Sequence, residues 1–322
     1  MKCNLCPRRC SPTDGEWGFC GVRQRQGDKF VLTTYGLTTG LAVDPIEKKP
    51  LYHFYPGSKV LSFGTIGCNF SCEFCQNYRT AQSRDRSLLR QAALPDDIVR
   101  LAKETGCRSV AFTYNEPIIW AEYVVDVAVA CRQAGIKTVA VSNGSITPEK
   151  RPWFFEFIDA ANIDLKSFSD DFYRTRCGAA LAPVKETLTY LAKSTNILLE
   201  VTTLLIPGLN DSEAELRELA AWLHKHLGAE TPLHFSAFRP MNRLLDVPPT
   251  PPKALFRARE IAMQAGLRYV YTGNIDDPAG GTTQCPQCQQ AVIMRNGYVV
   301  VEYAVDEESC CRFCGQTIRL EA

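Results

Sequence analysis

The sequence predicts an α/β protein built around a partial (β/α)6, TIM-like barrel, and three observations support this fold class. Between about residues 60 and 275, short apolar runs alternate with amphipathic stretches, which is typical of βαβ units and a parallel sheet. About six such units are present, fewer than the eight that a closed barrel needs. Cysteine-rich segments flank this region on both sides. We therefore expect a Cys-rich N-terminal segment (1–50), a core (51–278) and a small C-terminal module (279–322).

The apolar runs and the helical periodicities give the order of the elements. The predicted strands are Val60–Thr65, Ser109–Thr113, Thr138–Ser142, Ala161–Leu165, Ile197–Leu205, Leu233–Phe238 and Tyr269–Tyr271. The predicted helices are Pro95–Thr105, Ile118–Ala134, Pro148–Ile158, Pro183–Lys193, Ser212–Leu227 and Pro252–Ala265. Ser212 precedes an acidic first turn, which indicates a capped helix start. Residues 276–283 predict a linker to the C-terminal module.

Composition and charge are those of an ordinary globular protein. The chain has 322 residues, 45% of them hydrophobic and 22% charged, and a net charge of +1. This balance gives no overall field that would favour nucleic acid or a membrane surface. The N-terminus lacks the apolar core of a signal peptide, and the longest apolar stretch, near Tyr123–Cys131, is too short to span a bilayer. We expect a cytoplasmic protein.

Fifteen cysteines are the unusual feature of the composition. Twelve of them fall into three clusters, near the start, at 68–75 and near the end. Clustered C-x2-C spacing without a signal peptide indicates metal binding in a reducing compartment rather than a disulfide framework. Cys107, Cys131 and Cys177 stand alone, and we expect them to be buried as small hydrophobic side chains.

The central cluster is Cys68-Asn-Phe-Ser-Cys72-Glu-Phe-Cys75, which directly follows the first predicted strand. Three thiolates on one loop do not complete a four-ligand site, whereas an iron–sulfur cubane normally takes one cysteine per iron. Three protein ligands therefore leave one iron open for a substrate or cofactor. A structural zinc loop or a set of buried thiols is the other interpretation.

The C-x3-C-x2-C spacing resembles the defining motif of the radical SAM superfamily. The resemblance implies that Cys68, Cys72 and Cys75 hold a [4Fe-4S] cluster and that S-adenosylmethionine (SAM) binds its fourth iron. It also implies reductive cleavage of SAM to a 5′-deoxyadenosyl radical, an oxidoreductase or lyase type of chemistry, with electrons from a flavodoxin- or ferredoxin-type donor. Phe74 would pack near the adenine.

Polar residues follow three of the next strands, and the ends of parallel strands are where ligands gather. Glu116, next to Asn115, could accept the amino group of SAM, or be a solvated loop acid. Ser142 and Asn143 precede a glycine that allows close approach to a ligand. Asp164 and Lys166 share one face of their strand. The lysine could bind a carboxylate, or the two could form only a surface ion pair.

These strand ends resemble the branch of the superfamily that contains the pyruvate formate-lyase activases. Asn115-Glu-Pro, Ser142-Asn-Gly and Asp164-Leu-Lys carry the match. Three departures weaken the transfer of activase function. Val141 replaces an acidic residue, Arg239 stands about where those enzymes carry His, and their ferredoxin-like cysteine insert is absent. Arg239 remains a candidate SAM-binding residue.

A longer match covers essentially the whole chain and resembles the AmmeMemoRadiSam system radical SAM enzyme. The matching segments are Val43–Gly57, Cys75-Gln-Asn77, Cys3-x2-Cys6-Pro-Arg-Arg-Cys10 and Gly18-Phe-Cys20-Gly-Val-Arg23. The resemblance implies Memo-type and AMMECR-type partner proteins and an unidentified small-molecule or RNA substrate. A glycyl-radical-enzyme activase and a non-catalytic metal-binding scaffold are the alternative functions.

The C-terminal cysteines form two C-x2-C pairs, Cys285/Cys288 and Cys311/Cys314, around a predicted hairpin at Ala291–Glu302 with Asn-Gly at its turn. This pattern is typical of a zinc ribbon. An auxiliary iron–sulfur cluster is the alternative, and Cys310 is a spare ligand. A module of about forty residues has a core too small for stability alone, so we expect a metal to hold it together.

The N-terminal cysteines, Cys3, Cys6, Cys10 and Cys20, could form a second four-cysteine site. Their spacing is compact and irregular, which leaves zinc, an auxiliary cluster and redox thiols open. Nearby arginines make this segment locally basic. Such a patch could contact a partner or RNA, although a solvated face is the ordinary explanation.

Overall fold

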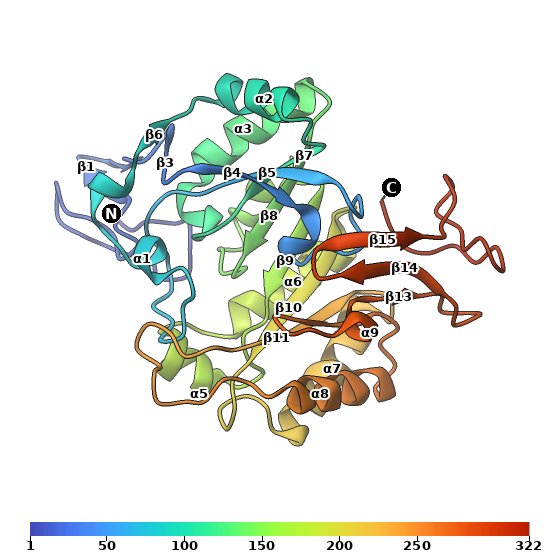
Figure 1. The fold of residues 1–322 in the computed structure, drawn as a ribbon. Coiled ribbons are helices and arrows are strands. Elements are labelled where there is room, and N and C mark those ends of the chain that lie inside the picture. Colours follow the sequence, from blue (N-terminus) through green and yellow to red (C-terminus); the bar gives the residue numbers. More distant parts are fainter. Residues whose placement is uncertain (322) are drawn as a thin grey trace.

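The computed structural model describes residues 1–321, and its centre is an open, mostly parallel eight-stranded sheet (Figure 1). The strands follow one another across the sheet almost in chain order, as βαβ units produce. Their bounds, from one edge to the other, are β4 (Leu41–Pro45), β5 (Lys59–Phe63), β7 (Ser109–Phe112), β8 (Lys137–Ser142), β9 (Ala160–Asp164), β10 (Leu198–Leu205), β11 (Leu233–Ala237) and β12 (Val270–Gly273).

The sheet confirms the predicted parallel α/β arrangement and adds one strand to it. Strand β4 pairs antiparallel with β5 at one edge, whereas the other neighbouring strands run parallel. In the described residues β4 and β12 do not pair, so the sheet does not close into a barrel. The sequence prediction missed β4 because Asp44 and Pro45 interrupt its apolar pattern.

Helices lie in the connections between the strands. The longer ones are α2 (Pro95–Glu104), α3 (Ala121–Gln133), α4 (Arg151–Phe155), α6 (Ala182–Ser194), α7 (Glu213–Leu227) and α8 (Pro252–Gln264). All six predicted helices are found. The one predicted at Pro148–Ile158 is shorter than expected, and the one predicted from Ile118 begins with a 3-10 turn, Pro117–Trp120. Ser212 caps α7 by accepting a hydrogen bond from the Glu215 N–H, as predicted.

Short elements complete the fold. The short helices are α1 (Tyr78–Ala81), α5 (Asp170–Phe172) and α9 (Pro278–Gly281), and 3-10 turns lie at Ile46–Lys48 and Arg86–Leu88, with a π-helical turn at Tyr173–Cys177. The small strands are β1 (Arg23–Gln26) with β2 (Lys29–Leu32), β3 (Leu37–Thr38) with β6 (Gln91–Ala92), and β13 (Thr283–Gln284) with β14 (Ala291–Asn296) and β15 (Val299–Tyr303).

The main core lies between the sheet and its helices and also includes the N-terminal segment. Phe63 of β5 packs against Trp120, with ring centroids 5.5 Å apart. Leu5 and Val22 are buried in the same cluster of hydrophobic residues. The N-terminal segment therefore packs directly onto the core.

The C-terminal strands share a small core with the end of the large sheet. Tyr52, Tyr269 and Tyr271 pack against Cys285 and Ile293 in one buried cluster. The predicted hairpin forms β14 and β15. This module lies on the side of the molecule opposite the N-terminal segment (Figure 1). Because three tyrosines from outside the module contribute to this core, a metal is not the only source of the module's stability.

Among residues 1–321, none of the helices combines the length and the apolarity that crossing a lipid bilayer would require.

One fully buried ion pair connects the C-terminal module to the core, and we expect its loss to be costly. Arg295 approaches Glu47 at 3.4 Å and donates to the Tyr52 carbonyl at 2.7 Å. Arg295→Met leaves the Glu47 carboxylate buried without its cation, which should lower the free energy of unfolding by about 3–5 kcal/mol. Urea unfolding measures this change.

The matched control is Arg217→Met, which removes an exposed pair with Glu213 and should change stability by no more than about 1 kcal/mol. Equal effects of the two substitutions would contradict the structural role of Arg295. Replacing Glu47 by Gln in the Arg295→Met background should recover part of the loss, because it removes the unpaired charge.

Candidate metal centre and cofactor cavity

Cys68, Cys72 and Cys75 lie on one loop between β5 and α1, and neighbouring segments hold its backbone. The Cys72 carbonyl accepts hydrogen bonds from Gln82 (2.7 Å) and Asn242 (3.1 Å). One residue earlier, the Ser71 N–H donates to the Cys177 carbonyl at 2.9 Å. The loop is therefore fixed on several sides, which preorganises the three sulfurs.

Asn115 holds the segment that leads into this loop. Its side-chain oxygen accepts the Thr65 N–H at 3.0 Å, and its side-chain nitrogen donates to the carbonyls of Ile66 and Gly67, both at 3.0 Å. Both ends of the amide are thus occupied. We predicted Asn115 as a cofactor contact, and the structure shows that its side chain positions the cluster loop, although it also lines the cavity described below.

The three thiols are suited to hold a cluster rather than to act as free thiols. Burial raises the pKa of Cys68 well above its ordinary value and that of Cys75 to about 11. A hydrogen bond with Cys177 lowers the pKa of Cys72. The Phe70 N–H points to the Cys68 sulfur at 3.3 Å, a contact that stabilises a thiolate. Thiolate ligands with amide donors fit an iron–sulfur cluster.

Cys177 was predicted as a lone buried thiol, and it is buried. Its thiol, however, forms a hydrogen bond with the thiol of Cys72. The sequence separates the two residues widely, so spacing gave no signal of this contact.

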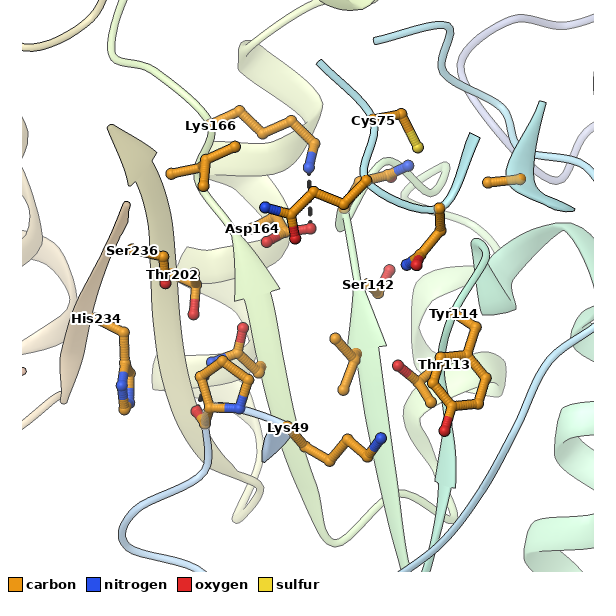
Figure 2. A pocket seen from close by; sticks show the side chains of 18 of the residues that line it. Lys49, Cys75, Thr113, Tyr114, Ser142, Asp164, Lys166, Thr202, His234 and Ser236 are labelled. Atoms are coloured by element: carbon orange, nitrogen blue, oxygen red, sulfur yellow. Dashed lines mark hydrogen bonds and ion pairs between the residues drawn. The ribbon is translucent and has the colours of Figure 1, made fainter. Parts of the chain in front are cut away.

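All three cysteines line a cavity of about 410 Å³ at the carboxyl ends of the parallel strands. This is where α/β sheets bind ligands, and the volume suits a small molecule. Most of the predicted cofactor residues line the same cavity: Phe74, Asn115, Glu116, Ser142, Asn143, Asp164 and Lys166. Figure 2 shows Cys75, Lys166 and Asp164 near one end of it and Lys49 near the other.

Glu116 is buried and occupied by hydrogen bonds. It accepts from Ser142 at 2.6 Å and from the Asn143 N–H at 2.8 Å. Burial raises the pKa of Glu116 to about 7, although these hydrogen bonds oppose the shift. The carboxylate also accepts the Ile118 N–H at 3.0 Å. It therefore links the ends of β7 and β8 where they border the cavity. The interpretation as a solvated loop acid is wrong, since only 3% of Glu116 is exposed.

Asp164 and Lys166 form an ion pair of 2.9 Å at the end of β9. Burial opposes the charge of Lys166, but Asp164 and the thiols of Cys72 and Cys177 outweigh it and raise its pKa. The lysine is therefore a permanent cation beside the cysteine loop. Only 17% of its side chain is exposed, so this pair is more than a surface contact.

A second lysine, Lys49, lies at the far end of the cavity and was not predicted. It pairs with Asp44 at 2.6 Å, and Asp44 also accepts from the Tyr114 hydroxyl at 2.6 Å. Burial lowers the pKa of Lys49. The resemblance included this segment as part of a long match, but nothing in its pattern indicated that Lys49 enters the cavity.

Polar residues of the central strands form the floor between the two lysines. Asn162 of β9, Thr202 of β10, and His234 and Ser236 of β11 line the cavity. Figure 2 shows the last three. His234 forms a hydrogen bond of 2.6 Å with the Glu200 carboxylate. The Thr202 hydroxyl is buried and has no partner in the described part of the chain. An orphaned hydroxyl facing a cavity is suited to a ligand.

This polar floor had a signal in the sequence. Central strands of parallel sheets are normally apolar throughout, so the polar residues Asn162, Thr202 and His234 on three adjacent strands mark an unusual face.

Of the predicted cofactor residues, Phe74 forms part of the cavity wall, whereas Arg239 lies outside the cavity. Phe74 is buried and packs on Phe172, with ring centroids 5.6 Å apart. Arg239 is exposed and does not line the cavity. It follows the buried Phe238, and the chain turns toward solvent at Pro240. The structure therefore does not support Arg239 as a SAM contact.

The C-terminal cysteines converge tightly. The sulfurs of Cys285, Cys288, Cys311 and Cys314 all lie within 4.8 Å of one another, and two pairs are 3.6 and 3.7 Å apart. Zn–S bonds of about 2.3 Å in a tetrahedron place sulfurs about 3.8 Å apart. The spacing therefore fits a single metal ion. Cys310 points elsewhere, toward Glu308 and Thr317.

Comparison with known proteins agrees with this site. The model of the Radical SAM superfamily matches residues 63–220, a range that contains the three cysteines and the strand ends described above. A protein of Methanocaldococcus jannaschii, the uncharacterized protein MJ0808, is 40% identical over 99% of this chain and 95% of its own length. The chain belongs to the radical SAM superfamily.

Two further matches extend the comparison. The pyruvate formate-lyase 1-activating enzyme of Escherichia coli is 25% identical over 51% of this chain and 68% of that enzyme. A radical SAM methyltransferase from Sphaerobacter thermophilus has a similar fold, with a TM-score of 0.50 and 17% identity over 70% of each chain. The first match supports homology to glycyl-radical-enzyme activases, and the second shows only the fold.

The raised pKa of Glu116 predicts a pH-dependent stability. Because the folded protein favours the protonated carboxyl, this contribution is complete below the ordinary pKa of 4.5 and is lost as the pH rises through about 7. Glu116→Gln does not titrate. Its unfolding free energy relative to wild type should therefore rise with pH, by at most about 3 kcal/mol. Anaerobic urea unfolding between about pH 5 and pH 8 measures the difference.

Glu122→Gln is the control. Burial alone would raise the pKa of Glu122, but the ion pair with Arg23 outweighs burial and lowers it. The unfolding free energy of Glu122→Gln relative to wild type should therefore not change with pH in this range. A flat difference for Glu116→Gln as well would contradict the raised pKa.

Proposed function

We propose that this protein is a radical SAM enzyme that cleaves SAM at a [4Fe-4S] cluster held by Cys68, Cys72 and Cys75. One observation carries the proposal: the three sulfurs, a fixed carboxylate and a fixed lysine line one cavity at the carboxyl ends of a parallel sheet. When bound, the cluster would supply the one electron that breaks the sulfonium C–S bond of SAM, which would yield methionine and a 5′-deoxyadenosyl radical for hydrogen abstraction from a substrate not yet identified.

The residues at the cluster end of the cavity would bind the polar groups of SAM. Lys166 is a cation beside the loop and would bind the carboxylate, with Asp164 holding its ammonium in place. Glu116 would accept the amino group, and its hydrogen bonds with Ser142 and Asn143 fix its orientation. The Phe74 ring would pack near the adenine of SAM.

The remaining part of the cavity would receive the substrate. Lys49 and the orphaned Thr202 hydroxyl lie there, which favours a polar and anionic substrate over an apolar one. A flavodoxin- or ferredoxin-type protein would donate the electron. Memo-type and AMMECR-type partners and an AmmeMemoRadiSam assignment remain proposals that rest on the sequence resemblance.

A glycyl-radical-enzyme activase is the second candidate, and the similarity to an activating enzyme favours it. A protein substrate would have to insert a glycine-bearing segment into the cavity. The exposed position of Arg239 in place of a histidine, and the absence of the ferredoxin-like insert, favour the first candidate. The third candidate, a non-catalytic metal-binding scaffold, predicts a protein that folds and binds metal but does not cleave SAM.

Reductive SAM cleavage tests the proposal. After anaerobic reconstitution with iron and sulfide, wild type given SAM and dithionite should form 5′-deoxyadenosine, measured by chromatography. Cys72→Ala should reduce the product to background, because two cysteines do not hold the cluster. Cys107→Ala removes a buried thiol outside the cavity and should retain activity. Equal activity of Cys72→Ala and wild type would exclude the cluster assignment.

We also propose that the C-terminal module is a zinc ribbon. The purified protein should contain about one zinc per chain at the four cysteines. Cys314→Ser should lose this zinc and destabilise the module, whereas Cys310→Ser, one residue from the ligand Cys311, should keep it. Emission spectrometry measures the metal. Iron in place of zinc, or zinc lost from Cys310→Ser, would contradict the assignment.

A further inference from the structure

The four N-terminal cysteines, which are far from equally spaced in sequence, converge in the fold. Cys3, Cys6, Cys10 and Cys20 all line one small cavity under the cluster loop. The segment closes on itself through the Cys3 N–H, which donates to the Cys10 carbonyl at 2.8 Å. The Phe19 N–H points to the Cys10 sulfur at 3.4 Å. Convergent sulfurs with amide donors are typical of a metal site.

The spacing of these sulfurs distinguishes the kind of metal. Among residues 1–321, the C-terminal four form the group whose ligand atoms approach within 4.8 Å of one another. The N-terminal four share a cavity but do not meet this closely, and the same holds for Cys68, Cys72 and Cys75. A cubane separates its cysteine ligands more widely than a single zinc ion does. In this respect the N-terminal four are like Cys68, Cys72 and Cys75 and unlike the compact C-terminal four, which favours a cluster over a single zinc ion.

An uncompensated cation lies beside the four cysteines. Arg8 is within electrostatic reach of Cys6, Cys10 and Cys20, and also of Cys68. It donates to the carbonyls of Asn69 and Gly178 and stacks 3.4 Å over the Phe19 ring. Within the described chain it forms no ion pair with a carboxylate. Four thiolates around iron carry a net negative charge, which this guanidinium would offset.

The N-terminal site also touches the SAM-cluster loop. A Cβ on Gly67, the residue before Cys68, would lie 2.1 Å from the Cys20 carbonyl oxygen. Only glycine allows this approach. Cys20 and Cys68 line a common surface cavity, and Asn69 lines the N-terminal one. The two cysteine groups are thus neighbours, although 48 residues separate Cys20 from Cys68 (68 − 20).

We infer that Cys3, Cys6, Cys10 and Cys20 hold a second [4Fe-4S] cluster, which passes electrons to the SAM cluster. Four protein ligands leave no iron open, so this centre does not bind SAM. Its chemistry is one-electron transfer. A flavodoxin- or ferredoxin-type donor gives one electron to the second cluster and is oxidised. The second cluster is then reoxidised when it passes that electron to the SAM cluster. No bond forms or breaks. The relay rests on the proposed function, whereas the site itself does not.

Metal analysis of the full-length protein, reconstituted anaerobically, tests the site. Wild type should hold about eight irons and eight sulfides per chain, in two clusters. Cys6→Ala and Cys10→Ala should each retain about four, with Mössbauer spectra showing one cluster lost. Cys107→Ala should retain all of them. Iron analysis of wild type alone already overturns the inference if it gives about four irons with about two zincs per chain.

The Cys68/Cys72/Cys75 triple Ala variant separates this inference from the proposed function. It should lose SAM cleavage and still hold about four irons at the N-terminal site. Complete loss of iron in that variant, with circular dichroism unchanged, would overturn the second cluster and leave the proposed function intact. Conversely, wild type that holds both clusters but never cleaves SAM would overturn only the proposed function.

The relay has its own readout. In Cys6→Ala, reduction of the SAM cluster by a flavodoxin, followed by absorbance, should be lost or slowed relative to wild type. Dithionite should reduce the SAM cluster of both proteins, because a small reductant needs no relay. Equal flavodoxin rates for the two proteins would overturn the relay.

Discussion

The position of the candidate metal centre depends on the buried amide of Asn115. Strands β5 and β7 are parallel neighbours in the sheet, and the cluster loop leaves the first while Asn115 leaves the second. Four hydrogen bonds join the amide to Thr65, Ile66 and Gly67. The backbone approach is so close that a Cβ on Gly64 would lie 2.2 Å from the Thr113 carbonyl oxygen. This contact fixes the height of the cysteine loop above the sheet.

The same kind of link repeats along the sheet edge and ties each strand end to the next. Glu116 binds Ser142 and the Asn143 backbone, and the Asn143 side chain donates to Asn69 in the cysteine loop at 2.8 Å. A buried network in which every member is satisfied specifies one arrangement. Residues at separate strand ends therefore act as one rigid frame around the cavity, which is what cofactor positioning requires.

The sequence allowed prediction of the elements and of the cluster end of the cavity for a shared physical reason. Apolar strands, capped helices and polar strand ends are local patterns, so Glu116, Asp164 and Lys166 could be placed on one edge without knowing the packing. Lys49 and Cys177 could not be placed, because long-range contacts bring them to the site. Arg239 became a candidate through its alignment with a histidine. It lies exposed outside the cavity, because the chain turns toward solvent after Phe238, a direction that the sequence does not show.

The positions of the two outer cysteine groups argue for different physical roles. The C-terminal group is built into a core with Tyr52, Tyr269 and Tyr271, on the far side from the N-terminus (Figure 1). A compact metal there would crosslink a hairpin to the sheet and would have no need to change charge. The N-terminal group instead adjoins the cysteine loop through Gly67 and shares the cation of Arg8 with it. A change of one electron at either centre would alter the field at the other, so their reduction potentials would be coupled. Such coupling is a reason to place a redox centre, rather than a structural ion, at that position.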